Sequence, residues 1–593
     1  ILFRALQGQL IIEQLLQLLF HKNLTKMPSN KIMVHVPDRF GQRTNHHRRL
    51  TQLCGTLVPI YCKEVLPNTE ISQKLSIAVT MPPLTSDTYM RVQYKVEAFA
   101  IPLRLCFAGF ENWFTAKNSN VFDYESYVAV KDYLPYISMP VLQDGDDVDD
   151  KLHLPFVFSE SVSSGMVRFD RDVDDRGTLL NYFGISRGEE DISINRGAYP
   201  LNPGKMIAYH LVWQHWYRAP LVQKECFGVS DTTHYSDPSG VFFAGVLPSQ
   251  HYFSQTVGVA SMSNEVYFLL ADGCSLFQLR QRNYGFDYFT QAYPTASQPN
   301  MEVTVANGKF SISELRASNS LQQWLEMSQI AGNRLVDVCK VRYGANLKDG
   351  VAQRPILLGS ATYDVFTSGV TVTAQNDVLL EPTNPFSNQA GGRVGNAFGS
   401  GSDFIIDHFT AQEPMYIMVI GSLVPKATYG SGVPKDMMRY TKAGFGPSDL
   451  ADYPSYMLQN TGNEPIYKYE LSYRAAVNRN SIFGYTEKYA DWFYDRSDAV
   501  GEFSSAGSLH SFVLQRIFDS TPEVNSAFLE ISPFDMDDIT IVNAALSSYG
   551  CWVDIDFDTR YLWPLYPNSM PSLQNPAYEH GKPISVHRGG FRF

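Results

Sequence analysis

Residues 75–81 read Leu-Ser-Ile-Ala-Val-Thr-Met, and residues 91–98 read Arg-Val-Gln-Tyr-Lys-Val-Glu-Ala. In both stretches an apolar side chain alternates with a polar or small one, the period of a strand with one buried face. Residues 553–558, Val-Asp-Ile-Asp-Phe-Asp, repeat this pattern near the end of the chain. Residues 416–424, Tyr-Ile-Met-Val-Ile-Gly-Ser-Leu-Val, are largely apolar, as in a strand covered on both faces. The sequence therefore predicts an all-β fold with core strands from both ends of the chain.

Two segments interrupt the strand pattern and favour helices. Residues 206–218 place Met206, Tyr209 and Trp213 on one side at helical spacing. Residues 311–330 open with Ser-Ile-Ser-Glu, a capping-box pattern, and end before Gly332. Both helices are expected as additions to a β core.

Long polar connections separate the expected strands. Connections beyond about 15 residues are uncommon in compact domains unless they are functional. With no internal repeat and no clean linker, the chain is expected to form one sandwich of two antiparallel sheets with large insertions. The expected long connections are 140–205, 226–262, 385–405 and 425–465.

The composition indicates a folded protein with large contact surfaces. Of 593 residues, 18% are charged, below the usual quarter, and 13% are aromatic, which suits interfaces. The net charge of −12 argues against a non-specific nucleic-acid binder. Any nucleic-acid contact must therefore be local, or shared with another basic component.

The cysteines and the N-terminus exclude several classes. Seven widely spaced cysteines without a Cys-x-x-Cys pair predict reduced thiols, not a disulfide framework or a zinc ribbon. No stretch reaches the roughly 20 apolar residues of a membrane span. Residues 1–20 resemble an amphipathic helix without a signal-peptide cleavage site. We expect Met27 to be the start and residues 1–26 to come from upstream translation; the alternative is a genuine internal arm.

The motifs that could carry chemistry are weak. The acidic loops at 144–150 and 170–174 depart from the calcium-loop register, so solvated or ion-paired loops are favoured over calcium sites. His210 and His215 lie five apart, which favours packed or capping histidines over metal ligands. The glycine-rich stretch 391–401 lacks a phosphate-loop ending and suggests a mobile loop. We therefore predict no catalytic residues, no metal, no cofactor and no enzymatic activity.

One basic cluster precedes the first predicted strand, within an expected N-terminal arm of residues 1–49. A flexible basic segment can neutralise phosphates. We predict DNA contacts here, with an ordinary solvated arm as the alternative. The candidate residues are Arg39, Arg43, His46, His47, Arg48 and Arg49.

Six short blocks occur in a fixed order between about Leu50 and Leu573. Each block is weak alone, but together they are specific: the chain resembles the Microviridae major capsid protein, particularly its gokushovirus-like branch. The blocks are Leu57–Pro67 (LVPIYCKEVLP), Ala208–Arg218 (AYHLVWQHWYR), Asp287–Pro294 (DYFTQAYP), Leu315–Glu326, Gln353–Gly359 and Phe483–Ala490 (FGYTEKYA).

This resemblance implies an eight-stranded antiparallel jelly roll, the viral β-sandwich, with large loop insertions and a few helices. It implies a domain over 50–573, a tail over 574–593, and a self-assembling T=1 icosahedral shell around circular single-stranded DNA. The implied location is the virion, assembled in the host bacterial cytoplasm. The matched aromatics are expected to anchor subunit interfaces or core packing: Trp213, Tyr217, Tyr288, Phe289, Phe483 and Tyr485.

The chain departs from the family after the third block. Only about twenty residues separate Pro294 from Glu314, too few for the long surface protrusion of gokushovirus-like members. Other loops or a separate spike protein would then contact a host receptor. Further expected partners are other copies of the chain, the DNA genome, a small basic DNA-binding protein and a pilot protein.

Two other functions fit the residues less well. A secreted β-sandwich carbohydrate-binding protein or glycosidase would also carry long loops and many aromatics, but no signal peptide is evident. A phage spike or tail component would often show fibrous repeats, which the sequence lacks.

Overall fold

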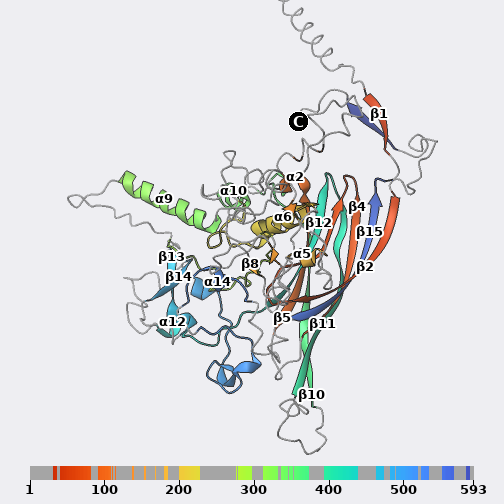
Figure 1. The fold of residues 1–593 in the computed structure, drawn as a ribbon. Helices are drawn as coiled ribbons and strands as arrows, with labels where there is room; N and C mark the ends of the chain where they lie inside the picture. The colour runs from red at the N-terminus through yellow and green to blue at the C-terminus, as the bar shows by residue number, and fades with distance from the viewer. Residues whose placement is uncertain are drawn as a thin grey trace, which may run out of the picture.

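A computed structural model gives the fold of the chain (Figure 1). It describes residues 31–36, 40–81, 91–107, 110, 114, 137–138, 153–154, 167–168, 179–184, 200–227, 276, 278–296, 312–331, 335–344, 346, 348–351, 353–372, 393–438, 463–472, 481–487, 489–518, 522–532, 550–565 and 582–587. Several sequence predictions lie outside these residues and stay predictions. They concern residues 1–26, Arg39 and the acidic loops at 144–150 and 170–174.

Eight long strands form one antiparallel sheet that runs β2-β15-β4-β11-β10-β5-β12-β3. Of these eight strands, β2 is first and β15 last in the sequence, and the two are neighbours in the sheet. One half of the sheet is β2-β15-β4-β11 and the other is β10-β5-β12-β3. Most strands that follow each other in the sequence, such as β2 and β3, lie in different halves, whereas β5 and β10 lie in the same half. This is the jelly-roll order, in which two four-stranded halves meet through β10 and β11. The strands are β2 (Phe40–Gln52), β3 (Val58–Val65), β4 (Glu70–Thr80), β5 (Val92–Pro102), β10 (Ile356–Val372), β11 (Arg393–Thr410), β12 (Met415–Pro425) and β15 (Cys551–Trp563).

The two halves of the sheet face each other across one core. Tyr94 on β5 donates its hydroxyl hydrogen to Gln52 Oε1 on β2 at 2.8 Å, although the two strands are far apart in the sheet order. Gln52 Nε2 then donates to the carbonyls of Thr56 and Gly421. This buried amide is thus satisfied by three groups that join the two halves.

The four strands predicted from periodicity are confirmed. Alternate side chains of β4 and β15 are buried, as a half-buried strand requires. Every residue of β12 is buried, as expected for the apolar run at 416–424. The predicted all-β sandwich and its jelly-roll form are therefore correct.

Two expectations about connections were wrong. Residues 40–49, expected in a flexible arm, form most of strand β2, and this strand pairs with β15 along its whole length. Residues 393–405, expected in a glycine-rich loop, form the first part of β11. A Cβ on Gly401 would overlap the Tyr363 ring, so glycine here allows close packing on a strand rather than loop mobility.

Helices lie along one side of the sandwich (Figure 1). α6 (Gly204–Val212) continues into the π-helix η2 (Trp213–Tyr217), which confirms the predicted helix at 206–218. The Tyr209 hydroxyl on α6 donates a hydrogen bond to the Leu57 carbonyl at 2.7 Å. Because Leu57 directly precedes β3, this bond holds the helix against the start of that strand. The second predicted helix is α9 (Ile312–Ala331), followed by α10 (Leu335–Tyr343).

Smaller elements surround the sandwich. β1 and β16 form an antiparallel ribbon near the C-terminus, beyond one end of the sandwich strands (Figure 1). β13 and β14 form another, beside a second buried cluster that includes Phe289, Tyr429 and Phe528. The remaining elements are β1 (Lys31–Val36), α2 (Leu103–Cys106), β6 (Ile137–Ser138), β7 (His153–Leu154), β8 (Val167–Arg168), α5 (Leu179–Tyr182), β9 (Pro200–Leu201), η7 (Asp436–Met438), β13 (Asn463–Tyr467), α12 (Lys468–Leu471), β14 (Ile482–Glu487), α13 (Ala490–Phe493), η9 (Gly501–Phe503), η10 (His510–Phe512), α14 (Ser526–Leu529) and β16 (Lys582–His587).

Candidate nucleic-acid interface

Strand β2 carries the described part of the basic cluster and places it on two opposite faces. Successive side chains of a strand point to opposite sides. His46 lies opposite the buried Phe557 of β15, whereas His47 lies opposite the exposed Asp556. Even-numbered residues of β2 therefore face the sandwich interior and odd-numbered ones face outward.

The outward face pairs bases with acids. Arg43 donates two hydrogen bonds to Asp558, at 2.7 and 2.8 Å, and this guanidinium holds the pKa of the Asp558 carboxyl below its usual value. Arg49 lies 3.7 Å from Asp554, which also contacts His47. Much of the positive charge on this face is therefore neutralised by carboxylates of the neighbouring strand.

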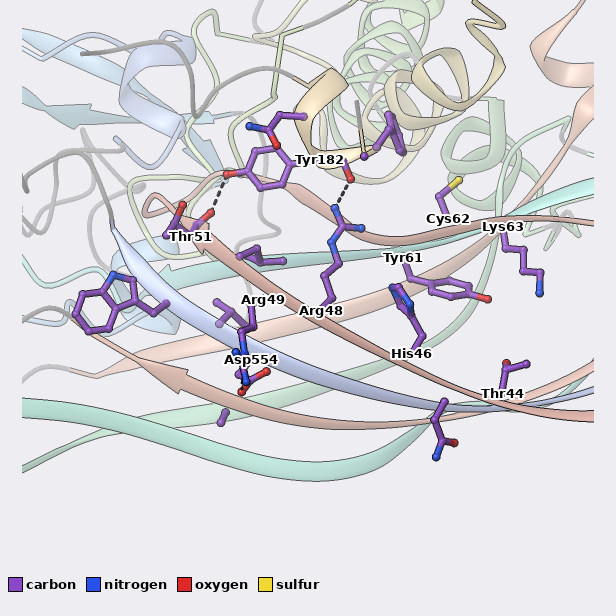
Figure 2. A pocket seen from close by; sticks show the side chains of 18 of the residues that line it. Thr44, His46, Arg48, Arg49, Thr51, Tyr61, Cys62, Lys63, Tyr182 and Asp554 are labelled. Atoms are coloured by element: carbon purple, nitrogen blue, oxygen red, sulfur yellow. Dashed lines mark hydrogen bonds and ion pairs between the residues drawn. The ribbon is translucent and has the colours of Figure 1, made fainter. Parts of the chain in front are cut away.

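The inward face is different, because its guanidinium binds backbone carbonyls. Arg48 donates to the carbonyl of Ile60 at 3.0 Å and to the carbonyl of Tyr182 on α5. Figure 2 shows Arg48 extending from β2 toward Tyr182, with Tyr61 and His46 beside it. His46 stacks on Phe557, with 6.0 Å between ring centroids. Burial is the larger cause that lowers the pKa of His46, and the nearby charge of Arg48 is the second. At neutral pH this imidazole is therefore largely uncharged.

A cavity of about 1290 Å³ opens beside β2, and its lining includes inward-facing residues such as Arg48 as well as Arg49 and Asp554 from the outward face. Side chains from β2, β3, β15 and the segment around α5 line it (Figure 2). Lys63 on β3 lies over the rings of Tyr561 and Trp563, at 4.3 and 5.1 Å from their centroids. Burial lowers the pKa of Lys63. The cavity lining thus combines the cations Arg48, Arg49 and Lys63 and the Asp554 carboxylate with several aromatic rings.

Sequence reasoning missed Lys63, Tyr61 and Tyr182 as members of this site. Tyr61 and Lys63 alternate on one strand, so their shared face was readable from the block 57–67. The sequence could not predict that these two side chains lie close to β2, because that depends on the order of the strands in the sheet. Tyr182 donates to the Thr51 carbonyl at 2.7 Å and places α5 against β2.

His210 is a packed histidine, as predicted. Its Nδ1 accepts a hydrogen bond from Arg280 Nε at 3.0 Å, so its Nε2–H donates to the Leu276 carbonyl at 2.9 Å. Burial and the nearby Arg280 guanidinium keep the pKa of His210 well below its usual value. Within the described ranges, no group of three or more His, Cys, Asp or Glu side chains could hold a metal ion.

The predicted aromatic anchors lie mainly inside the subunit. Trp213, Tyr288, Phe289 and Phe483 are buried in the two apolar clusters. Tyr217 is partly buried and donates its hydroxyl hydrogen to Glu97, and Tyr485 exchanges backbone hydrogen bonds with Tyr293. The role of these six aromatics at subunit interfaces stays a prediction.

Comparison with known proteins identifies the family. The family model described as capsid protein (F protein) matches residues 198–573, well over half of the chain. The chain belongs to this family of phage capsid proteins. It is 21% identical to the capsid protein VP1 of Spiroplasma virus 4 over 603 aligned positions, covering 92% of this chain and 96% of that protein.

Two other relatives match shorter regions. The capsid protein VP1 of Chlamydia phage 1 is 28% identical over 45% of this chain and 43% of its own length. The capsid protein VP1 of Bdellovibrio phage phiMH2K is 26% identical over 37% of this chain and 39% of its own length. All belong to the Microviridae, so the resemblance drawn from the six blocks is confirmed. The chain is a major capsid protein, and the secreted carbohydrate-binding alternative is not favoured.

None of the described helices is long and apolar enough to cross a membrane. The longest of them, α9, carries charged and amide side chains along its length. The family is one of structural proteins, and membership places the chain in the virion as part of a shell of identical subunits.

Proposed function

We propose that this capsid protein assembles by itself into a T=1 icosahedral shell that encloses a circular single-stranded DNA genome. Assembly in the host bacterial cytoplasm and the absence of enzymatic activity belong to the same proposal. The observation that carries it is the alignment with a Microviridae capsid protein over 92% of the chain. The jelly-roll strand order supports it, because a closed sandwich leaves its loops free to meet neighbouring subunits.

A self-assembling shell needs apolar surface that is exposed on the single subunit. Helix α9 offers such a surface, since it projects from the body of the subunit (Figure 1) and none of its described side chains is buried. Its exposed apolar residues recur every third position, which forms a ridge along the helix. They are Leu321, Trp324, Met327 and Ile330.

We infer that this ridge packs against a neighbouring copy in the shell. Trp324 is 50% exposed and is the largest side chain of the ridge, which makes it the expected anchor. Because the substitution Trp324→Ser removes this apolar anchor, it should raise the protein concentration needed for assembly by about tenfold or more. Light scattering against protein concentration measures this threshold.

The matched control is Gln323→Ser on the same helix, because Gln323 is exposed and polar. It should assemble at the concentration of the unchanged chain. Circular dichroism would establish that both variants fold alike. Equal thresholds for Trp324→Ser and the unchanged chain would remove α9 from the interface.

The proposed partners follow from the same function. Strand β2 supplies Arg48, which pairs with no carboxylate among the described residues, for the DNA genome, and the net charge of −12 leaves room for a small basic DNA-binding protein. A pilot protein and a separate spike protein remain part of the proposal. The short segment between Pro294 and Glu314 favours host-receptor contact through a spike or through other loops.

Negative-stain microscopy of the expressed chain tests the proposal. Uniform closed shells near the size of the smallest phages are expected without any other phage protein. A monomer that stays unassembled at every salt concentration would contradict self-assembly.

A further inference from the structure

The two faces of β2 differ in whether an acidic group balances their positive charge. Outward-facing Arg43 and Arg49 lie beside Asp558 and Asp554. Among the residues that the structure describes, no carboxylate forms an ion pair with Arg48 or Lys63. Arg49 and Asp554 also line the cavity and lie beside each other, so Arg48 and Lys63 are the lining cations that no described carboxylate pairs with.

The acidic groups nearest Arg48 remain uncharged at neutral pH. Burial raises the pKa of the Cys62 thiol to about 12, and burial also raises the pKa of the Tyr94 phenol well above its usual value. Two carbonyl oxygens accept from the Arg48 guanidinium, which carries five N–H donors. A largely buried cation held only by neutral groups favours an anionic partner.

The shape and rings of the cavity narrow the choice of anion. Its volume of about 1290 Å³ is larger than a simple inorganic ion needs and lies above the usual range of small-molecule pockets. Tyr61, Tyr182 and Trp552 line it. Aromatic side chains beside cations are the pattern that binds single-stranded nucleic acid, with bases on the rings and phosphates on the cations.

We propose that this cavity between β2 and β3 binds a nucleotide of single-stranded DNA, with its phosphate on Arg48 and Lys63 and its base against the aromatic rings. This proposal rests on the proposed function, because it assigns the genome contact to one face of β2. It also shifts the contact from the whole basic cluster to the inward residues and adds Lys63, which lies on a different strand.

The test compares Lys63→Gln with Arg43→Gln, each in the full-length chain. Both variants remove one positive charge, but Lys63 lines the cavity and Arg43 lies on the outward face. A fluorescent oligothymidylate is titrated with each protein, and its anisotropy is followed at several salt concentrations. Lys63→Gln should weaken binding several-fold and reduce the salt slope by about 0.7, the loss of one phosphate contact on a single strand. Arg43→Gln should leave both quantities nearly unchanged.

Arg48 is better tested by Arg48→Lys, because its guanidinium also joins β2 to β3 and α5. The lysine keeps the charge but loses the fork that binds a phosphate at two points. Weaker binding with an unchanged salt slope is expected. Thermal unfolding of each variant separates a binding loss from a folding loss, and inorganic phosphate serves as a competitor at constant ionic strength.

Several outcomes would overturn the nucleotide site. Equal losses in Lys63→Gln and Arg43→Gln would mean that only net charge matters, and a loss in Arg43→Gln alone would place the contact outside the cavity. Full competition by inorganic phosphate at low concentration would mean an anion site without a base. Microscopy of the same samples keeps the two proposals apart: intact shells that fail to bind the oligonucleotide contradict this site and leave the shell function standing.

Discussion

Glu470 is the buried carboxyl whose ionisation most clearly depends on its surroundings. Its side chain is 3% exposed, and its Oε1 accepts a hydrogen bond from the Tyr467 backbone N–H at 2.8 Å. Burial raises the pKa of Glu470 to about 7, against the opposing effects of that N–H and of the Lys435 ammonium. Glu470 is therefore substantially protonated in the folded protein near neutral pH.

A raised pKa in the folded state has a definite effect on stability. Below pH 4.5, the ordinary value, Glu470 is protonated in both the folded and the unfolded chain. As the pH rises to about 7, the unfolded chain ionises first, so the free energy of unfolding falls. In the unchanged chain, Glu470 should lower the free energy of unfolding by about 3 kcal/mol between pH 4.5 and pH 7. Glu470→Gln should abolish this decrease, because glutamine does not ionise. Thermal unfolding at both ends of the window, with and without the substitution, measures it.

The control for this prediction is Glu502→Gln. Glu502 is exposed, and hydrogen bonds from Ser508 lower its pKa, whereas the pKa of Glu470 is raised. The substitution of Glu502 should lower the unfolding temperature more at pH 7 than below pH 4.5, the opposite sign to the change expected for Glu470→Gln. If Glu470→Gln behaves in this same way, the carboxyl is ionised in the folded protein and the raised pKa is wrong.

Arg48 and Arg49 show which properties of single residues the sequence could and could not predict. The basic cluster was visible as Arg48 and Arg49, but the two neighbours have opposite environments. Arg49 faces the acidic ladder of β15, whereas Arg48 reaches Ile60 and Tyr182. Which of them binds an acid depends on the strand that lies alongside, and that strand is about five hundred residues away in the chain.

At the scale of elements, β2 and β15 form a paired set of charges. The outward face of β15 carries Asp554, Asp556 and Asp558, opposite the basic residues of β2. Exposed ion pairs of this kind contribute little to stability, because water and salt screen them. The larger effect of the aspartates is that they compete with phosphate for Arg43, His47 and Arg49.

Removing this competition gives a second test of the outward face. The triple variant Asp554→Asn, Asp556→Asn, Asp558→Asn should bind oligothymidylate more tightly, with a steeper dependence on salt, because its arginines are then free for phosphates. Anisotropy titrations measure both quantities.

A control with the same change in net charge uses three exposed aspartates elsewhere, Asp407, Asp436 and Asp495. Their replacement by asparagine should increase affinity much less. Equal increases in the two triple variants would show that the ladder does not specifically neutralise β2.

The sequence predicted those elements whose burial follows a period. β4, β5, β12 and β15 bury alternate or continuous apolar residues, and α6 has a helical apolar side. The sequence did not predict β2 and β11 as strands, because neither shows a regular alternation or a continuous run of apolar residues. β2 is an edge strand rich in polar side chains, and β11 opens with a glycine-containing stretch in which Gly401 makes room for Tyr363.

At the scale of the whole molecule, the jelly roll brings together segments from both ends of the chain. β2 pairs with β15, and β1 pairs with β16, so the two chain ends meet twice. A boundary at residue 50 would separate β2 from the sheet that it completes. The sandwich domain therefore begins by Phe40, and the wider division into one domain and a tail stays a prediction.

The sequence reached the fold class by periodicity and the strand number through the family resemblance. The six ordered blocks predicted a capsid protein, and the family match over 198–573 confirmed it. The aromatics named from those blocks lie mainly inside the subunit, and their role in subunit contacts stays a prediction. The exposed ridge of α9 became visible only with the side chains in place.

The most direct test of the account is a three-dimensional cryo-electron microscopy reconstruction of particles formed by the expressed chain. We predict a closed icosahedral shell with one chain in each asymmetric unit and the eight-stranded sandwich in every subunit. Open sheets, tubes, or a shell with several distinct copies in its asymmetric unit would contradict the proposed T=1 assembly.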